Sequence, residues 1–243
     1  SFVGIKPIVV HGGGPQISET LERFGIKSSF VGGLRKTDSQ TIRVVQRVLC
    51  GQINKDITSS INAQGAKAVG LSGIDASLIE AKPLDKEVYF TSLKMEVPEE
   101  DLGFVGEVQD INAELLETFL NKGFVPVVAP LGIDASGRVY NINADLVASA
   151  IATKIRATKL IYLSDAPGIR DQNSNTISSI DILGAKSLIE RGLIKGGMLP
   201  KLYSAFEALK SGVKKVHIID GRVKHSILLE VFTNEGIGTE VLP

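Results

Sequence analysis

The sequence contains no tryptophan and only one cysteine, Cys50, among its 243 residues. A single cysteine can neither close an internal disulfide nor build a multi-cysteine metal site, and this scarcity favours a reducing compartment. We therefore assign no metal ligand. We interpret Cys50 as a small apolar residue of a helix that packs in the core.

Long apolar runs and an excess of one charge are also absent. No run approaches the roughly 20 apolar residues of a membrane-spanning helix, and no secretory signal opens the chain. The 27 basic and 27 acidic side chains give a formal net charge of zero. We expect neither a membrane nor nucleic acid as a partner. The expected location is the cytoplasm, or in a eukaryote a plastid or mitochondrion reached through a removed presequence.

Apolar, β-branched runs alternate with segments of helical period, which is typical of a mostly parallel sheet covered on both faces. The predicted strands are Pro7–Val10, Ala68–Leu71, Val125–Ala129, Leu160–Leu163 and Val216–Ile219. The predicted helices are Pro15–Phe24, Asp38–Ala63, Ala113–Lys122, Ala144–Ile155, Ala185–Gly192, Met198–Lys210 and Ser226–Phe232. The predicted fold class is α/β, an open αβα sandwich with antiparallel additions.

Two segments lack this alternation and predict β-hairpins, Lys86–Val108 and Asp134–Ile142. The second turns at the residues Asp-Ala-Ser-Gly that open it. A new strand–helix series begins after Ala157, so we expect an N-terminal lobe of residues 1–157 and a C-terminal lobe of residues 158–243.

Three consecutive glycines, Gly12 to Gly14, lie between a predicted strand and a helix that Pro15 begins. Bare glycines let backbone amides at a helix N-terminus approach an anion. The alternative is a tight turn that needs positive φ, but one glycine would satisfy such a turn. The loop does not match G-x-G-x-x-G and the chain has no G-x-x-x-x-G-K-[ST], so neither a dinucleotide-binding Rossmann enzyme nor a P-loop enzyme is supported.

Other glycine-rich loops carry charged or amide side chains. Arg35 follows Gly32-Gly33 and suits a carboxylate, with a solvated surface arginine as the alternative. Lys201 follows Gly196-Gly197 at the start of a helix, where a cation gains nothing from the helix dipole and so suggests a facing anion.

The segment Tyr140-Asn141-Ile142-Asn143-Ala144-Asp145 leads into another helix. Capping accounts for Asn143 and Asp145 but not for Asn141. The spacing identifies no nucleophile partner for any of the three histidines. The sequence therefore does not indicate a hydrolase catalytic triad. Loops rich in anion holders and poor in acid–base groups are what phosphoryl transfer needs.

At these residues the chain resembles the amino acid kinase family, and within it the branch that phosphorylates N-acetyl-L-glutamate. The matching segments run through the whole chain in order: HGGGPQI, FVGGLRKTD, AVGLSGIDASLI, LGFVGEV, YNINADLVASAIA, YLSDAPGI, GLIKGGMLPKL, VHIIDGRVKHSILLE and NEGIGTEV.

This resemblance implies an amino acid kinase fold, with acetylglutamate binding and dimerisation in the N-terminal lobe and ATP in the C-terminal lobe. The implied reaction transfers the γ-phosphoryl group of ATP to the side-chain carboxylate, in arginine biosynthesis, with Mg²⁺ held mainly by the nucleotide phosphates. The family begins with a strand that carries a lysine followed by paired glycines. Only ten residues precede His11 and none forms that motif, so we expect that the first βα unit is missing from this chain.

The resemblance also implies roles for single residues. Gly13 and Gly14 would hold substrate and phosphoryl oxygens, Arg35 the substrate α-carboxylate, and Asn141 the amino-acid end of the substrate. In the same way Lys201 would stabilise the transferring phosphoryl group.

Asp145 would orient the catalytic lysines. The segments that would line the nucleotide are Asp165, Ala166, Pro167, Gly168, Ile169 and Arg170, together with Leu193, Ile194 and Lys195.

Alternatives and additions remain open. A catalytically silent arginine-sensing domain, or a sibling kinase for glutamate, aspartate or an aminoadipate derivative, would share this fold. Residues His217, Glu235 and Gly238 resemble the effector site of arginine-inhibited members, which predicts L-arginine as an inhibitor. We expect a homodimer or a hexamer, and a PII-type signalling protein is a further candidate partner.

Overall fold

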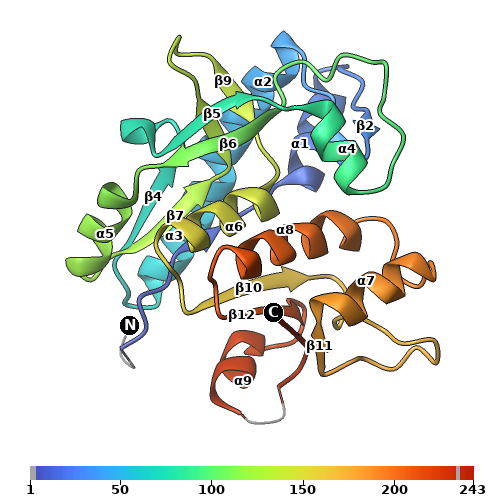
Figure 1. Cartoon of the computed structure of the whole chain (residues 1–243). Helices are drawn as coiled ribbons and strands as arrows, with labels where there is room; N and C mark the ends of the chain where they lie inside the picture. The colour runs from blue at the N-terminus through green and yellow to red at the C-terminus, as the bar shows by residue number, and fades with distance from the viewer. Residues whose placement is uncertain (1–3, 234–235) are drawn as a thin grey trace. The chain divides into compact units, whose positions relative to one another are not determined.

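The computed structural model describes residues 4–233 and 236–243. The contacts divide the chain into two compact units, Ser1–Ile151 and Ala152–Pro243. Among the described residues the first unit contains three β-sheets, one of them the two-stranded sheet of β2 (Phe30–Val31) and β3 (Leu34–Arg35), and the second unit contains one. Helices pack against the sheets in each unit (Figure 1). In the described part of the chain, no helix has both the length and the apolar character that crossing a bilayer would require.

The first unit is built around a parallel sheet in the order β1-β7-β4 and a second sheet in the order β6-β5-β8-β9. Its strands are β1 (Val9–Val10), β2 (Phe30–Val31), β3 (Leu34–Arg35), β4 (Ala68–Ser72), β5 (Ile79–Pro83), β6 (Gly106–Ile111), β7 (Val125–Ala129), β8 (Leu131–Ile133) and β9 (Val139–Asn141). Its helices are α1 (Gly14–Arg23), α2 (Ser39–Gln46), η1 (Arg47–Ile53), α3 (Asn54–Ala63), η2 (Asp75–Ser77), α4 (Lys86–Ser92), α5 (Ala113–Asn121) and α6 (Ala144–Lys154), the last of which continues into the second unit.

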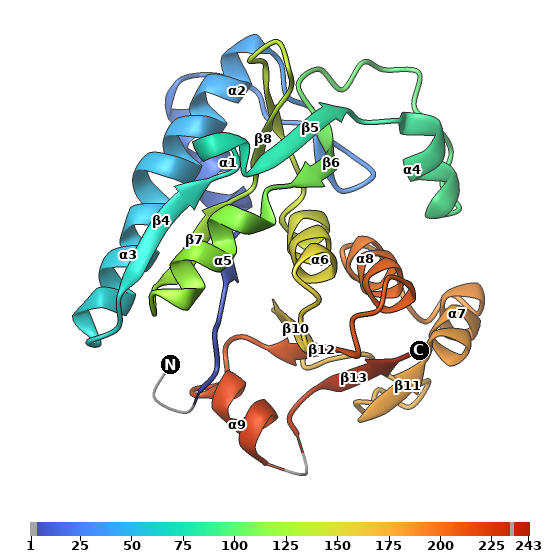
Figure 2. The same ribbon diagram turned by 60° about the vertical axis from the view of Figure 1, so that its left-hand side comes forward.

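Strand β7 lies at the centre of the first unit. It pairs in parallel with β1 on one side and with β4 on the other. Helices α3 and α5 both pack on it, from different sides in Figure 2. All five of its residues are buried, which explains why the sequence shows a continuous apolar run there and no alternation. The carboxyl ends of β1, β7 and β4 lie side by side, and this is where ligands bind in open α/β sheets.

The long helical segment predicted from Asp38 is one continuous helical run with an irregular middle. The Asp38 carboxylate accepts hydrogen bonds from the backbone N–H groups of Gln40 and Thr41, at 3.1 and 2.7 Å, and so caps α2. Between α2 and α3 the run widens to the π-helical η1, which contains Cys50. Cys50 is half-buried against the core, and burial raises the pKa of its thiol.

The second unit contains a mixed sheet in the order β10-β12-β13-β11. Its elements are β10 (Lys159–Ser164), β11 (Ser179–Asp181), α7 (Ile182–Glu190), α8 (Met198–Lys210), β12 (Lys215–Asp220), α9 (Ser226–Phe232) and β13 (Thr239–Leu242). Strand β12 pairs in parallel with β10 and antiparallel with β13. Helices α8 and α9 pack on opposite faces of β12 (Figures 1 and 2), and every residue of β12 after Lys215 is buried.

The predicted α/β class, with parallel strands and antiparallel additions, is confirmed. The predicted hairpin over Asp134–Ile142 is also confirmed, since β8 and β9 pair antiparallel. The Asp134 carboxylate closes its turn by accepting from the N–H groups of Ser136 and Arg138, at 2.8 and 3.0 Å.

The predicted hairpin over Lys86–Val108 is wrong. The Asp85 side chain accepts from the N–H of Val88 at 3.1 Å and starts helix α4. Phe90 of that helix is buried with Leu34 and Leu102, and this burial outweighs the strand preference of the Val-Tyr-Phe run. The strand that pairs with β6 is β5, which precedes α4.

Candidate active site

The glycine loop lies where the sequence places it, between β1 and α1. The N–H of His11 donates to the carbonyl of Val128 at 3.3 Å, which extends the pairing of β1 with β7 to the edge of the loop. Helix α1 begins at Gly14, with Pro15 in its first turn. None of the three glycines has a φ in the left-handed region, and that of Gly13 is extended at 176°. The tight-turn explanation of this loop therefore fails.

Packing explains only one of the three glycines. A Cβ atom on Gly13 would collide with Ile53 and lie 2.8 Å from the Leu49 side chain. A Cβ atom on Gly12 would have only an ordinary contact, at 3.9 Å from Ala144. Gly14 is exposed, and nothing lies within 4 Å of the position of its Cβ. Neither the backbone conformation nor packing therefore requires glycine at Gly12 and Gly14. The lack of side chains at these two residues leaves space for a ligand beside the backbone.

Arg35 is buried, with only 5% of the residue exposed, and it lies against this loop. Its Nη2 donates to the carbonyl oxygen of Gly14 at 2.8 Å and to Ser18 Oγ at 3.0 Å, and its Nη1 donates to Ser28 Oγ. The guanidinium carbon lies 4.4 Å from the centre of the Phe30 ring. The surface-arginine alternative is wrong. Burial lowers the pKa of Arg35, although an arginine stays charged at neutral pH.

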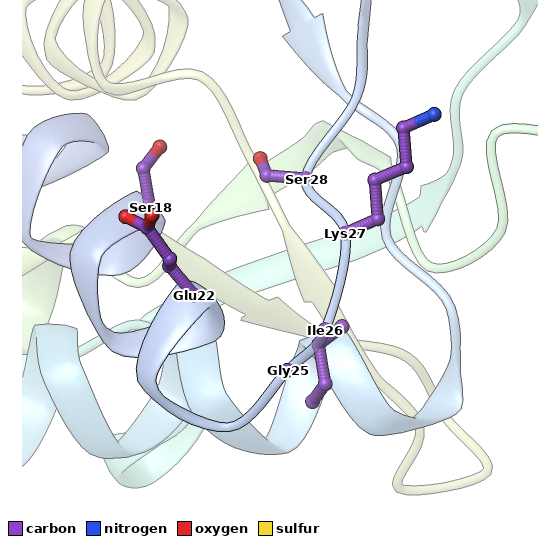
Figure 3. Close-up of a pocket in the computed structure, with 6 residues that line it drawn as sticks. All are labelled: Ser18, Glu22, Gly25, Ile26, Lys27 and Ser28. Carbon is purple, nitrogen blue, oxygen red and sulfur yellow. The ribbon is translucent and has the colours of Figure 1, made fainter.

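The partners of Arg35 leave its charge uncompensated. They are two hydroxyls, a carbonyl and an aromatic ring, and within the described residues Arg35 forms no ion pair with a carboxylate. Ser18 and Ser28 also line a surface pocket of about 400 Å³ (Figure 3), together with Glu22, Gly25, Ile26 and Lys27. A buried cation with only neutral partners favours an anionic ligand, because burying an unpaired charge is costly.

Asn141 is connected to Arg35 through a residue that the sequence interpretation did not single out. The Asn141 Nδ2 donates to Thr37 Oγ1 at 3.2 Å, and Thr37 Oγ1 donates to the carbonyl oxygen of Arg35 at 2.7 Å. The structure thus brings together Gly14, Arg35 and Asn141, three of the predicted site residues. The available signal for Thr37 was its position two residues after Arg35, because residues i and i+2 of an extended segment face the same side.

The capping explanation holds for Asn143, whose Oδ1 accepts from the N–H groups of Asp145 and Leu146 at 2.8 and 3.4 Å. Asp145 itself lies in the first turn of α6. Burial raises the pKa of the Tyr89 hydroxyl to about 12, and the negative charge of Asp145 adds to that shift. The Asn143 side chain thus supplies the cap of this helix, and the predicted role of Asp145 stays a prediction.

A second buried polar side chain, Asn54, was also missed by sequence analysis. It is 1% exposed at the start of α3. Its Nδ2 donates to the carbonyls of Leu71 on β4 and Val127 on β7, at 3.1 and 2.9 Å. It also lies 3.2 Å from His11 Nε2. Asn54 therefore ties together the carboxyl ends of the parallel strands under the glycine loop.

The contacts of His11 assign its tautomer. Nδ1 lies 2.9 Å from the carbonyl oxygen of Gly12, which can only accept, so Nδ1 carries the proton. Nε2 then accepts from Asn54. Burial lowers the pKa of His11, against a smaller opposite effect of the Gly12 carbonyl. A neutral His11 is thus part of the support of the loop.

In the second unit, Lys201 lies in the first turn of α8. Its Nζ is 4.8 Å from the centre of the Tyr162 ring on β10, and the hydroxyl of Tyr162 is 2.5 Å from Ser204 Oγ. The Lys201 ammonium therefore makes a cation–π contact with this ring. The predicted function of Lys201 stays a prediction.

The predicted nucleotide segments lie in two loops of the same unit. Residues 165–170 follow β10, with Ile169 buried and its N–H donating to Thr239 Oγ1 at 2.8 Å. Gly168 in this loop has a φ of 136°, and a Cβ there would crowd Thr239. Residues 193–195 connect α7 to α8, with Ile194 buried and Lys195 exposed. Both loops are anchored by their isoleucines and expose charged neighbours.

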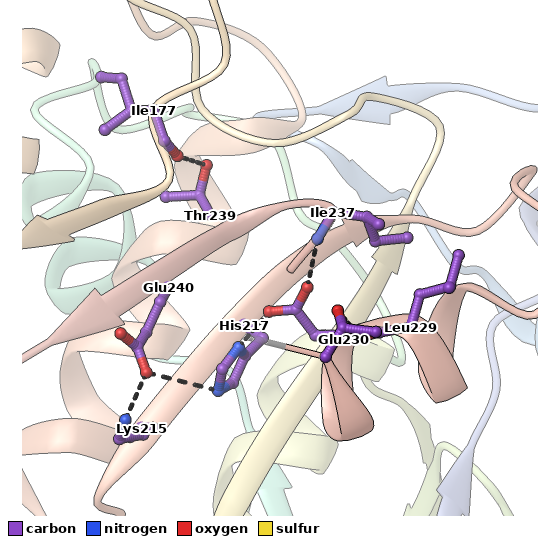
Figure 4. A network of polar contacts seen from close by, with 9 residues as sticks. Ile177, Lys215, His217, Leu229, Glu230, Ile237, Thr239 and Glu240 are labelled. Carbon is purple, nitrogen blue, oxygen red and sulfur yellow. Dashed lines mark hydrogen bonds and ion pairs between the residues drawn. The ribbon is translucent and has the colours of Figure 1, made fainter. Parts of the chain in front are cut away.

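Two of the residues predicted for an arginine effector, His217 and Gly238, have close contacts within the second unit. His217 is buried, with Nδ1 2.5 Å from Glu230 Oε1 and Nε2 3.9 Å from Glu240 Oε1 (Figure 4). Burial opposes ionisation of Glu230, but hydrogen bonds from Ile237 N–H and His217 outweigh it and lower the pKa of that carboxyl. Gly238 lies so close to Ile218 that a Cβ would collide with its carbonyl.

Glu235 lies outside the described residues, so this effector site stays a prediction. Among the described residues, no group of three or more His, Cys, Asp or Glu side chains could hold a metal ion.

The sequence profile of the amino acid kinase family matches residues 2–220. The chain belongs to the amino acid kinase family. It is 59% identical over 243 residues to the acetylglutamate kinase of Aquifex aeolicus, covering 99% of this chain and 82% of the relative. It is 51% identical over 241 residues to the acetylglutamate kinase of Geotalea uraniireducens, again covering 99% of this chain and 82% of the relative.

Among solved structures, the chain is similar to N-acetylglutamate synthase from Neisseria gonorrhoeae complexed with coenzyme A and N-acetyl-glutamate. The TM-score is 0.85 at 24% identity, and the match covers 100% of this chain and 53% of that protein. This likeness supports the fold.

Proposed function

We propose that the protein transfers the γ-phosphoryl group of ATP to the side-chain carboxylate of N-acetyl-L-glutamate, giving an acyl phosphate and ADP. The phosphotransferase class follows from the family and from relatives that are acetylglutamate kinases at 59% and 51% identity. The observation that best supports N-acetyl-L-glutamate as the substrate is the environment of Arg35. This buried cation has only neutral partners and contacts the glycine loop. An α-carboxylate would supply the missing charge and could accept from the N–H groups of Arg35 that Gly14, Ser18 and Ser28 leave unused.

The bare amides at Gly13 and Gly14 would then face the oxygens of the reacting carboxylate and phosphoryl group. Fixed N–H donors at a helix N-terminus stabilise charge that develops during transfer. In the second unit, Lys201 would neutralise the moving phosphoryl group, and the loops 165–170 and 193–195 would line the nucleotide. Asp145 would orient lysine side chains.

Mg²⁺ is part of this proposal. As the resemblance to the family implies, the ion would be held mainly by the nucleotide phosphates, where it supplies positive charge. The chain's own residues would position both substrates. L-Arginine as inhibitor, a homodimer or hexamer, a PII-type partner and a cytoplasmic location are further predictions from the sequence.

The silent arginine-sensing domain is less well supported. Such a domain would need no cradle for a phosphoryl group, whereas Gly12 and Gly14 are bare without a structural reason. Sibling kinases for glutamate, aspartate or an aminoadipate derivative would also use an arginine for the α-carboxylate. The relatives' names favour acetylglutamate over these acids.

The test is turnover trapped with hydroxylamine, which converts an acyl phosphate to a coloured hydroxamate. The protein is incubated with MgATP and N-acetyl-L-glutamate, glutamate, aspartate or N-acetyl-aminoadipate in parallel. The chain covers 82% of the Aquifex aeolicus relative, and a second preparation carries in addition the part of that relative that the match leaves uncovered. Hydroxamate with acetylglutamate alone supports the proposal. Hydroxamate with another acid alone supports a sibling kinase, and arginine binding without any hydroxamate supports the sensor.

Binding of the α-carboxylate is tested separately by calorimetry. N-Acetyl-L-glutamate and its α-amide are compared on the wild type and on Arg35→Gln. The wild type should prefer the acid by about 10- to 100-fold, since a charged hydrogen-bonded pair is lost in the amide, and Arg35→Gln should remove the preference. The control is Arg23→Gln, which affects only an exposed pair with Glu19. An unchanged preference in Arg35→Gln would contradict the assigned role.

A further inference from the structure

Thr37 is fully buried and its backbone is held on both sides. It has 0% exposure. Its N–H donates to the carbonyl of Leu102 at 2.9 Å, and its carbonyl accepts from the N–H of Phe104 at 2.6 Å. Between them, Gly103 has a φ of 70° and lies so close that a Cβ would collide with the Thr37 carbonyl. The position of Thr37 is therefore set by the backbone, independently of its hydroxyl.

The hydroxyl of Thr37 connects two residues of the proposed substrate site. It has a single proton, and the carbonyl oxygen of Arg35, 2.7 Å away, can only accept. The proton is therefore directed at Arg35. The oxygen of the hydroxyl is then left to accept from Asn141 Nδ2 at 3.2 Å. This order of donors and acceptors permits only one orientation of the Asn141 amide.

That orientation has a consequence for the ligand. With Nδ2 held by Thr37, the Oδ1 of Asn141 accepts no hydrogen bond from the described residues. Oδ1 can only accept, so it suits an N–H donor, such as that of an acylated amino group. A rotated amide would present a donor there instead and would leave the N–H of the ligand unpaired, which is unfavourable in a partly buried site.

We propose that Thr37 is a positioning residue for the substrate: its hydroxyl fixes the amide of Asn141 and the strand of Arg35 so that both face the amino-acid end of the ligand. This proposal rests on the proposed function, since it specifies how that site is held in shape. Thr37 itself makes no contact with the reacting atoms.

The test compares Thr37→Val with Thr37→Ser. Valine keeps the shape and removes the hydroxyl, whereas serine keeps the hydroxyl and removes a methyl group. Thr37→Val should raise the KM and Kd for N-acetyl-L-glutamate about 10- to 100-fold, since small misplacements of binding groups have effects of that order. The KM for MgATP should stay within about two-fold, and Thr37→Ser should stay within about three-fold of wild type in every parameter.

The matched control is Thr41→Val. Thr41 is also buried, at 4% exposure, and lies four residues further on at the start of α2. Its hydroxyl interacts with Asp38 and not with the proposed site. A purely structural effect of losing a buried hydroxyl would appear in both valine variants, as less folded protein with an unchanged KM. The proposal requires the rise in KM in Thr37→Val alone.

A second readout separates this proposal from the proposed function. The side-chain NH₂ signal of Asn141, assigned with Asn141→Asp, is recorded by NMR in the wild type and both Thr37 variants. A shifted, faster-exchanging signal in Thr37→Val, with a normal one in Thr37→Ser, supports the positioning role even if no acid is phosphorylated. An unchanged NH₂ signal in Thr37→Val would overturn it, as would unchanged acetylglutamate binding by Thr37→Val when the wild type turns over.

Discussion

Replacing Gly14 with alanine should separate function from stability. Gly14 is the first residue of α1, its φ is not in the left-handed region, and nothing lies within 4 Å of the position of a Cβ. Alanine is a better helix residue than glycine by up to about 1 kcal/mol and loses less conformational entropy on folding. Gly14→Ala should therefore be as stable as the wild type or gain up to about 1 kcal/mol, or roughly 2–4 °C in Tm for a chain of this size.

Activity should change in the opposite direction. The added methyl group would stand over backbone amides that the proposed mechanism directs at the transferring group. Losing one fixed donor to a developing negative charge costs about 10²–10³ in kcat. Gly14→Ala should lose activity by this factor while its folded fraction stays intact.

The assay combines urea unfolding with hydroxamate formation. Gly51→Ala is the matched control, because Gly51 is also an exposed helical glycine with nothing within 4 Å of its Cβ position. It should gain similar stability and keep full activity. Gly13→Ala, unlike Gly14→Ala, should lower the free energy of unfolding by about 1–3 kcal/mol. The added methyl group overpacks against Leu49 and Ile53. Wild-type activity in Gly14→Ala would refute the anion cradle at this residue.

Three further predictions concern stability. Asn54→Ala removes a buried side-chain donor that bonds carbonyls of β4 and β7 and should cost about 1–3 kcal/mol in urea unfolding. Burial lowers the pKa of His11 below its usual value, so the unfolded chain binds a proton first, and stability should fall as the pH drops below about 6.5. Urea titrations between pH 7.5 and 5 should show this slope in the wild type and less of it in His11→Asn. The hydroxyl of Ser136, the N–H of Arg138 and further turn donors lower the pKa of Asp134 to about 2, so its stabilising contribution should persist above pH 4 and disappear towards pH 2. Asp134→Asn should flatten the acid limb of the same measurement.

The long helices and the buried parallel strands could be predicted from the sequence, whereas several other strands, including β2, β5 and β13, could not. Val125–Ala129 is an apolar run because both of its faces are covered, and Met198–Lys210 shows a helical period because one side faces the sheet. Strands β2 and β13 have only two and four residues. Such strands exist through pairing with partners elsewhere in the chain, and this pairing leaves no periodic signal.

The same division applies to the candidate site. Arg35 and Gly14 could be found because a charge or a glycine in a loop is conspicuous. Thr37, Ser18 and Asn54 could not, since neutral polar residues are common in loops and at helix ends. Their importance comes from burial and from hydrogen bonds to residues far away in sequence, as between Thr37 and Asn141.

Some glycines of this chain are required neither by a positive φ nor by close packing. These glycines are the ones that point most directly to a ligand site. Gly32 and Gly103 have positive φ angles, and Gly13 has no room for a side chain, so their structural roles are sufficient explanations. Gly14 and Gly197 have neither constraint, and each begins or precedes a helix of the proposed site. Glycine in such a place weakens the helix start, and a benefit from a ligand at the bare helix N-terminus would offset that cost, whereas the equally unconstrained Gly51 lies inside a continuous helical run. An anion bound at each helix N-terminus, the substrate at α1 and the nucleotide phosphates at α8, would supply that benefit in both units by the same physical means.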